Sequence, residues 1–556
     1  MLPALAIVLA LAVTCGALSS RSQEQGNEAR AFLRESGYPE QLYEWQHQLK
    51  TLEFIFPLDL ERFTWLRSNS IQELRFAAID NSTSIAGLAS LSNCSSLKKL
   101  SLSLGYSQVA DLKPLENLTG LTELSLALNK RAHDLEPLGH LTGLTRLALD
   151  LAYNAIAYKK ASNLEPLENL KGLTHLSIEL NGQAIDLKPL ENLKGLTHLS
   201  IEGIRTSDLK PLENLTWPIQ LDLALYGRQL TDLKPLENLK GLTRLSLSLE
   251  RSGLQDLKPL ENLTDLTDLS LFLSGRPLSD LKNLKGLTNL ALGDPKAEDL
   301  KLLGNLKGLT HLTLIHPVDL TPLENLKGLT HLTLDLQGIS DNNLKPLENL
   351  KGLTQLYIIF DYDGRLRDLK ALENLNRLTH LNIKKLVLNE QEGDLKLLEN
   401  LKGLTHLDIL LIDKEGALKP LENLKGLTHL DIAFINKGDD FKRLKRESEV
   451  ADLKSLEKLP GLTNLSFSPR SKRDWMQLGS LKGLTHLDLE ALSDPTSLEY
   501  LKELTHLSID ELPSELSDLS PVGAMKKLEK ISILSSIGVQ RLSIKKIPDS
   551  LVHLSF

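Results

Sequence analysis

Histidine occupies one fixed place in a hexapeptide that recurs along this 556-residue sequence. Ten of the fourteen histidines follow the pattern Leu-x-His-Leu, and they are His175, His198, His311, His331, His380, His406, His429, His486, His506 and His553. Asp408, Asp431 and Asp488 each stand two residues after such a histidine. Imidazole binds zinc and titrates near neutral pH, so this spacing could support metal binding or a response to pH.

The sharpest form of this hypothesis concerns His380, His406 and His429 beside Asp408 and Asp431. Side chains on consecutive strands, about 4.8 Å apart, could share a metal ion or repel one another once protonated near pH 6. The alternative is that duplication of one ancestral unit copied the histidine with no role attached. We favour this plain polar surface, because an exposed ladder has no neighbouring groups to orient its rings. We therefore expect neither a metal site nor a cofactor.

The elements that carry these histidines follow from a repeated string. The segment DLKPLENLKGLTHLSIE, Asp186 to Glu202, returns with small edits from Asp111 onward, usually every 22 to 26 residues. That period, with the pattern L-x-x-L-x-L, is the signature of a leucine-rich repeat that contributes one short strand to a parallel sheet. Leu196, Leu199 and Ile201 then face the interior, and the intervening positions, histidine included, face solvent.

The other half of the string predicts one turn of 3₁₀ or α-helix. The Asp186 carboxylate can accept backbone N–H groups as an N-cap, and Pro189 is tolerated in a first turn that needs no N–H donor. Gly195 permits the turn that ends it. The leucines between them are predicted to point inward, namely Leu187, Leu190 and Leu193.

Two of the units carry a family resemblance. DLKPLENLTGLTELSLALN (111–129) and NLEPLENLKGLTHLSIELN (163–181) resemble the internalin-type leucine-rich repeats of bacterial secreted and surface proteins. The resemblance implies an α/β solenoid: a right-handed coil with a concave parallel β-sheet, short 3₁₀/α turns on the convex side and a helical N-terminal cap. It also implies a binding protein that docks a macromolecular partner on its concave face.

Composition agrees with a single long array. Hydrophobic residues make up 41% of the chain but aromatic residues only 4%, which suits many identical leucine layers. Repeat units contact only their neighbours, so length adds units without enlarging one core, and we expect about 18 to 20 units over residues 70–556. The net charge of −8 is modest and basic residues are interspersed, so no basic face for nucleic acid is predicted.

The N-terminal residues differ from the repeats. Leu2 to Leu18 is apolar apart from Thr14, and we predict that residues 1–19 are a signal peptide. Retention as a signal anchor and lipidation at Cys15 are the alternatives. The protein is thus expected to be secreted or at the cell surface, with a membrane-anchored or cytoplasmic location as the alternative.

Residues 20–69 are predicted to form the helical cap. Leu42, Trp45, Leu49 and Leu52 have helical spacing, and the first unit of a solenoid needs a cover for its outer apolar layer.

The repeat breaks its own rule between Tyr357 and Trp475, where aromatic residues and the insert 436–450 appear. Aromatic and arginine side chains concentrate binding energy at interfaces. The alternative is that the loops are solvated spacers and the aromatics fill coil ends. The predicted partner-binding residues are Tyr357, Phe360, Tyr362, His380, His406, Asp408, His429, Asp431, Phe434 and Trp475.

No catalytic motif is present: the sequence has no G-x-S-x-G, H-E-x-x-H, P-loop or CxxC pair. Cys94 is expected to be a buried structural residue. We predict a non-enzymatic protein-binding solenoid, with an intracellular scaffold or phosphatase-regulator-like repeat protein as the alternative and a histidine-ladder metal binder as a third. The strand-like end, Leu551 to Phe556, predicts self-association through an exposed edge.

Overall fold

The computed structural model describes most of the repeat region and two short strands that precede it. The residues described are 5–8, 51–54, 71–76, 88–89, 91, 94, 96–105, 109, 111–128, 134–152, 163–206, 208–213, 215, 220–225, 230–248, 254, 256–272, 278–338, 343–360, 369–384, 395–412, 418–435, 453–469, 471–492, 494–512, 519–535, 550 and 553–555. The chain divides into two compact units. The N-terminal unit comprises Leu2–Leu266 with His553–Phe556, and the C-terminal unit comprises Thr267–Val552.

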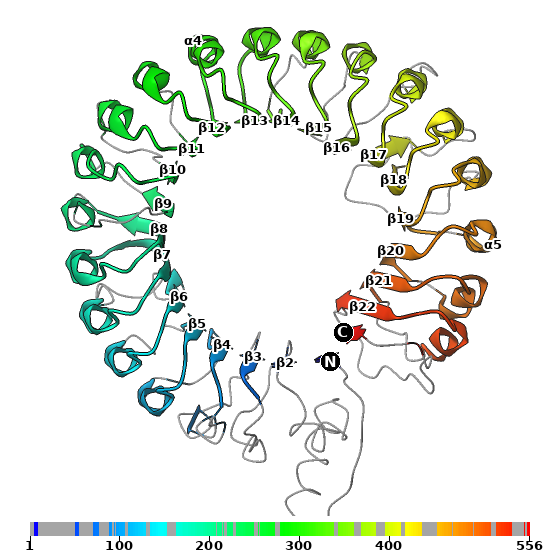
Figure 1. Ribbon diagram of the computed structural model, residues 1–556. Helices are drawn as coiled ribbons and strands as arrows, with labels where there is room; N and C mark the ends of the chain where they lie inside the picture. The colour runs from blue at the N-terminus through cyan, green and yellow to red at the C-terminus, as the bar shows by residue number, and fades with distance from the viewer. Residues whose placement is uncertain are drawn as a thin grey trace, which may run out of the picture. The chain divides into compact units, whose positions relative to one another are not determined.

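The N-terminal unit is a stack of strands and 3₁₀ turns (Figure 1). Its strands are β1 (Leu5–Val8), β2 (Thr51–Phe54), β3 (Glu73–Phe76), β4 (Lys99–Ser103), β5 (Glu123–Ala127), β6 (Arg146–Asp150), β7 (His175–Ala184), β8 (His198–Arg205), β9 (Gln220–Leu225), β10 (Arg244–Ser248) and β23 (His553–Ser555). Its turns are η3 (Lys113–Asn117), η4 (Glu136–His140), η6 (Glu165–Asn169), η7 (Lys188–Asn192), η8 (Lys210–Leu212), η9 (Lys234–Leu236) and η10 (Lys258–Asn262). From β2 to β10 each strand pairs in parallel with the next.

The C-terminal unit repeats the same plan. Its strands are β11 (Asp268–Phe272), β12 (Asn289–Gly293), β13 (His311–Ile315), β14 (His331–Asp335), β15 (Gln355–Ile359), β16 (His380–Lys384), β17 (His406–Ile412), β18 (His429–Ile435), β19 (Asn464–Ser466), β20 (His486–Ala491), β21 (His506–Glu511) and β22 (Lys530–Ser535). Its helical turns are η11 (Ser279–Asn283), α4 (Ala297–Leu302), η12 (Leu303–Asn305), η13 (Thr321–Asn325), η14 (Lys345–Asn349), η15 (Leu369–Leu372), η16 (Leu395–Asn400), η17 (Lys419–Asn423), η18 (Leu453–Lys458), α5 (Lys472–Ser480), η19 (Pro495–Tyr500) and η20 (Ser520–Ala524). All strand pairings from β11 to β22 are parallel.

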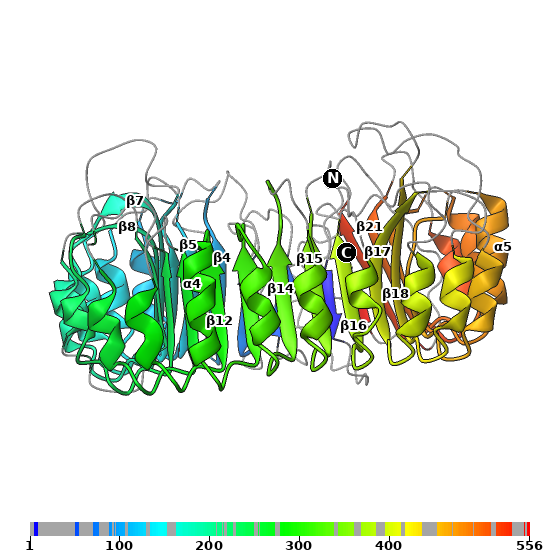
Figure 2. The ribbon, with the colours of Figure 1, turned by 90° about the horizontal axis from the view of Figure 1, so that it is seen from above.

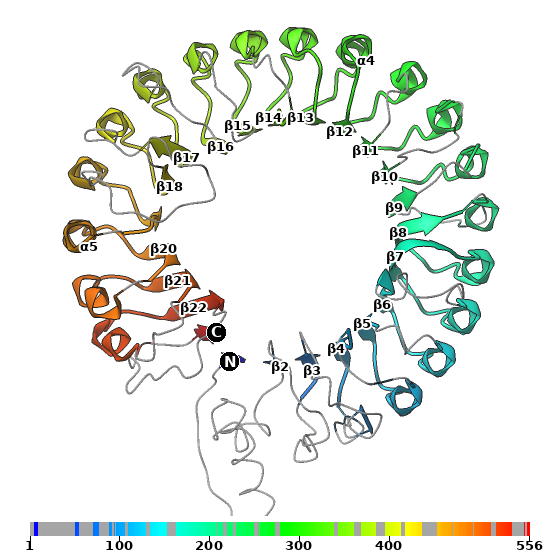
Figure 3. The same ribbon diagram turned by 180° about the vertical axis from the view of Figure 1, so that it is seen from behind.

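Leucine layers explain why strand and turn alternate. Leu196, Leu199 and Ile201 are at most 1% exposed, as are Leu190 and Leu193 on the turn side. Each buried leucine contributes roughly 1.5–3 kcal/mol of hydrophobic stabilisation, and neighbouring coils supply the cover that one coil lacks. Within each unit the sheet lines the inner, concave side and the turns lie outside it, as seen from opposite sides in Figures 1 and 3. Viewed from above, the strands run side by side in one direction (Figure 2).

The turn chemistry is confirmed at Asp186 and Pro189, with two corrections. Asp186 Oδ1 accepts the Lys188 backbone N–H at 2.9 Å, as its predicted capping role requires. The residue at the helix N-cap is nevertheless Leu187, because the 3₁₀ turn begins at Lys188 with Pro189 in its first turn. The aspartate therefore closes an Asx turn that leads the chain into the helix.

The second correction concerns the end of the turn. The 3₁₀ turn ends at Asn192 with Leu193 as its C-cap, and Gly195 does not adopt a positive φ. A Cβ at Gly195 would lie 3.3 Å from the Leu173 carbonyl oxygen, so glycine permits close packing of adjacent coils.

The predicted cap and leader lie outside the described residues except at two strands. β2 falls within the predicted helical cap but is a strand in parallel register with β3, which corrects the helical assignment of Leu52. β1 falls within the predicted signal peptide and pairs antiparallel with β2 and β23. Cleavage after residues 1–19 and self-association at the C-terminal edge remain predictions.

Two further observations concern Cys94 and membrane-spanning helices. Cys94 is buried at 2% exposure, which confirms its structural placement. Among the described residues, no helix is both long enough and apolar enough to cross a membrane.

Candidate functional site

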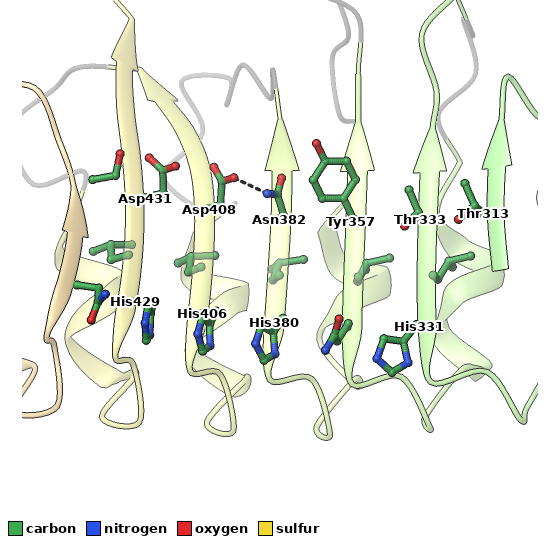
Figure 4. Close-up of a pocket in the computed structure, with 18 of the residues that line it drawn as sticks. Thr313, His331, Thr333, Tyr357, His380, Asn382, His406, Asp408, His429 and Asp431 are labelled. Carbon is green, nitrogen blue, oxygen red and sulfur yellow. Dashed lines mark hydrogen bonds between the residues drawn. The ribbon is translucent and has the colours of Figure 1, made fainter. Parts of the chain in front are cut away.

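The candidate site is the exposed face of the sheet in the C-terminal unit, where two rows of side chains cross the strands (Figure 4). The parallel registers align equivalent residues of every strand. One row, the histidine row, consists of His311, His331, Gln355, His380, His406, His429 and Asn464. The other, the carboxylate row, consists of Thr313, Thr333, Tyr357, Asn382, Asp408, Asp431, Ser466 and Asp488. Buried leucine and isoleucine side chains alternate with both rows.

The threonine before each histidine orients the ring. Thr405 Oγ1 donates its hydrogen to the Thr379 carbonyl oxygen at 3.0 Å and lies 2.8 Å from His406 Nδ1. Thr428 repeats this arrangement with the Thr405 carbonyl and His429 Nδ1, at 3.1 and 2.8 Å. A hydroxyl has one hydrogen to donate, so Nδ1 must be the donor in the contact between threonine and histidine. Each neutral ring thus carries its hydrogen on Nδ1 and leaves Nε2 as an acceptor.

The histidine rings stack on one another, and burial disfavours protonation of several of them. The ring centroids of His380 and His406 lie 4.0 Å apart, as do those of His406 and His429, with interplanar angles of 13°. Burial, followed by the charges of His429 and His380, lowers the pKa of His406 to about 4. Burial also lowers the pKa of His331 and His429. The hypothesis that protonation near pH 6 charges the stack therefore fails at His406, which is neutral at that pH.

In the carboxylate row, the pKa values of Asp408 and Asp488 shift upward, opposite to the shift at His406. Burial, followed by the neighbouring Asp431 charge, raises the pKa of Asp408 to about 6, against the opposing effect of Lys384 and of the Asn382 amide. Asn382 Nδ2 donates to Asp408 Oδ2. Burial, followed by Asp510 and Asp431, also raises the pKa of Asp488. Near pH 6 the Asp408 carboxyl is thus close to its midpoint, whereas the His406 imidazole is neutral.

The two rows line an open hollow of about 560 Å³ that extends from β13 to β20, hereafter the C-terminal hollow. Among the described residues its lining includes three carboxylates, Asp408, Asp431 and Asp488, and neither lysine nor arginine. Lys384 lies at its margin, with Nζ 5.8 Å from the centroid of the Tyr357 ring. The hollow is therefore rich in hydrogen-bond acceptors and negative in charge.

The structure brings six of the ten predicted contact residues into the C-terminal hollow, and they are Tyr357, His380, His406, Asp408, His429 and Asp431. It corrects two others: Phe360 is fully buried and Trp475, on α5, is only 3% exposed, because both fill the apolar interior of their coils. Tyr362 and the insert 436–450 lie outside the described residues. Phe434 lies on β18, and its side chain is outside the described part of the chain.

Sequence reasoning missed three contributors to this face. From the sequence, the threonines are predicted only to be exposed, whereas in the structure they orient the histidine rings. Their fixed position before histidine is the signal that could have identified this role. Asn382 and Lys384 occupy strand positions that follow His380 by two and four residues.

Among the described residues, no group of three or more histidine, cysteine or acidic side chains is arranged to hold a metal ion.

The N-terminal unit has a hollow of its own, of about 450 Å³, hereafter the N-terminal hollow. Its charged lining is balanced between Glu73, Glu123 and Asp222 and the cations Arg75, Lys99 and Arg146. Lys99 Nζ lies 3.0 Å from Glu123 Oε1 on the next strand. This hollow therefore neutralises its own charges.

One feature defines the fold: the described coils join an inward-facing L-x-x-L-x-L strand to a short 3₁₀ turn that carries the leucines of the DLKPLENLKG string. The chain folds as a leucine-rich-repeat solenoid, and its repeats resemble the internalin type. Solved structures with similar folds include an internalin (InlF) from Listeria monocytogenes, 23% identical over 75% of this chain and 88% of its own, with a TM-score of 0.29. Internalin C2 from the same organism is 31% identical over 32% of this leucine-rich-repeat chain and 77% of its own, with a TM-score of 0.26.

A mammalian leucine-rich-repeat structure is also similar. The mouse RP105/MD-1 complex contains a chain that is 18% identical over 88% of this chain and 85% of its own, with a TM-score of 0.48. No family model matches the sequence. No curated protein is similar to it at a significant level.

Proposed function

We propose that this leucine-rich-repeat chain is a non-enzymatic binding protein, secreted or exposed at the cell surface, that docks a protein partner on the sheet face of its C-terminal unit. The observation that carries the proposal is the C-terminal hollow: an open surface across consecutive strands, with polar side chains aligned by the sheet and charges that it does not balance. Such a preformed surface suits a rigid-body interface.

The chemistry of the hollow favours binding over catalysis. Its histidines stack on one another and bond to threonine, and none forms a hydrogen bond with a carboxylate in the way a nucleophile or general base is activated. The carboxylates also disfavour nucleic acid, because phosphate groups need nearby cations.

Affinity capture with face-directed variants tests the proposal. The double variant Thr333→Arg/Ser466→Arg places two long side chains in the C-terminal hollow. The matched control, Asn325→Arg/Asn423→Arg, adds the same charge to exposed ends of η13 and η17 on the outer side. We expect surface extracts of candidate host cells to yield a partner with the wild-type chain and the control but not with the hollow variant.

Capture that is equal for all three chains, or lost only in the control, contradicts docking on the sheet face. Export is tested separately by N-terminal sequencing of the mature protein. A chain that begins near Ser20 supports secretion, and an intact Met1 contradicts it.

A further inference from the structure

We propose that the C-terminal hollow recognises an arginine side chain of the partner, with its guanidinium seated between Asp408 and Asp431. This inference rests on the proposed function and specifies the chemistry of the partner. The two carboxylates are register partners on β17 and β18, which places them about 4.8 Å apart across the sheet. A planar guanidinium with five N–H donors can bond to both at once.

The first support is the unbalanced charge of the hollow. Within the described residues neither Asp408 nor Asp431 forms an ion pair. Two carboxylates on adjacent strands repel each other, and a cation between them converts this repulsion into attraction. Lys384 does not take that place, because its Nζ lies over the Tyr357 ring, 5.8 Å from the centroid. Tyr357 and Asp408 lie on opposite sides of Asn382 (Figure 4).

The second support is an acceptor without a donor. Asn382 Oδ1 is a buried atom that accepts no hydrogen bond from the described residues, while Nδ2 of the same amide donates to Asp408. A buried acceptor without a donor is unfavourable, so this row also favours a partner that supplies further N–H groups beside the guanidinium. This atom belongs to the same row as the two carboxylates, one strand away from Asp408.

The third support is the orientation of the histidine row. The threonine hydroxyls fix the hydrogen on Nδ1 of His380, His406 and His429, so their Nε2 atoms are acceptors. The Asp408 and Asp431 carboxylates and these Nε2 atoms are therefore acceptors, which favours a ligand that brings several donors. Arginine carries donors and no acceptor, whereas a hydroxyl-rich ligand brings as many acceptors as donors.

The test uses the full chain and three labelled peptides, namely blocked hexa-arginine, hexa-lysine and hexa-citrulline. Citrulline keeps the shape of arginine without its charge. Binding is measured by fluorescence anisotropy in buffer of about 150 mM salt. We expect the arginine peptide to bind more tightly than the lysine peptide and the citrulline peptide to bind least. We expect Asp408→Asn/Asp431→Asn to weaken the arginine peptide by about tenfold or more.

A matched control separates a site from diffuse electrostatic attraction. Glu324→Gln/Glu348→Gln removes the same two charges from η13 and η14 on the outer side of the same unit. The control should retain wild-type affinity, and circular dichroism confirms that both variants fold. Equal weakening in both variants, unchanged affinity in the aspartate variant, or equal binding of the lysine or citrulline peptide overturns the proposal.

The two proposals fail in distinguishable ways. If the partner is captured through the sheet face but hexa-arginine does not bind there, the guanidinium assignment is wrong and the docking proposal stands. If capture does not depend on the sheet face, the docking proposal is wrong whatever the peptides do.

Discussion

The row of side chains that begins each strand differs between β3–β6 and β16–β18, although the backbone that carries it is the same. In the first region the row is Glu73, Lys99, Glu123 and Arg146, in parallel register. In the second it is His380, His406 and His429, also in register. Opposite charges alternate in the first region, and identical neutral rings stack in the second.

This comparison separates the residues that build the coil from the side chains that its exposed face carries. Alternating charges pair with one another across strands, so little is left for a ligand. A column of identical rings cannot pair in this way, and the adjacent Asp408 and Asp431 carboxylates repel. The C-terminal region thus leaves Asp408 and Asp431 without an ion pair among the described residues.

The largest expected effect tests whether the apolar cores of the two regions are energetically equivalent. Leu407→Ala and Leu124→Ala remove inward side chains that are each 2% exposed. Both should lower the free energy of unfolding by about 2–5 kcal/mol, because each leaves a cavity between coils. Urea denaturation followed by circular dichroism measures the loss. A difference of more than about twofold between the sites would show that the cores are not equivalent.

A smaller effect concerns Asp408, whose raised pKa of about 6 exceeds the ordinary value of 3.8. The folded protein holds this proton more tightly than the unfolded chain, so the ionised carboxylate destabilises the fold above about pH 6, and the cost disappears below about pH 4. Asp408→Asn should therefore stabilise the protein by about 1 kcal/mol near pH 7.5 and by almost nothing near pH 4.

Thermal unfolding at both pH values measures this difference. The same stabilisation at both values would contradict the raised pKa.

The next effect concerns the ring orientation. Thr428→Val removes the acceptor of the His429 Nδ1 hydrogen and should cost about 1 kcal/mol. Thr145→Val is the control, because its hydroxyl donates to the Thr122 carbonyl at 3.1 Å and the next residue is Arg146. Nitrogen-15 NMR of the imidazole rings should show one Nδ1–H form of His429 in the wild type and a mixture in Thr428→Val. A mixture already present in the wild type would contradict the threonine lock.

The smallest effect is expected in the charged row. Glu123→Gln removes the partner of Lys99 in an exposed ion pair and should cost about 0.5 kcal/mol or less, with the loss vanishing at about 1 M salt. Denaturation at low and high salt measures it. A salt-independent loss would mean that Glu123 acts through packing instead of charge.

Much of this architecture was predictable because it depends on local spacing. The period of the leucines gave the strand positions, and the Asp-x-x-Pro segment gave the 3₁₀ turns, because each choice is made within a few residues of the chain. The contacts of Tyr357 and Phe360 were less predictable. The two lie three residues apart at the point where the repeat departs from its pattern, and the strand places Tyr357 on the exposed face and Phe360 in the core.

The sequence by itself determined the repeat, the inward leucines and the exposure of the histidine and aspartate positions, because side chains alternate along a strand. Only the tertiary structure decided what those positions do. The pKa of His406 falls and that of Asp408 rises because neighbouring strands bury them and place like groups beside them. Those neighbours are more than twenty residues away in the chain, so their effect arises only once the coils stack in register.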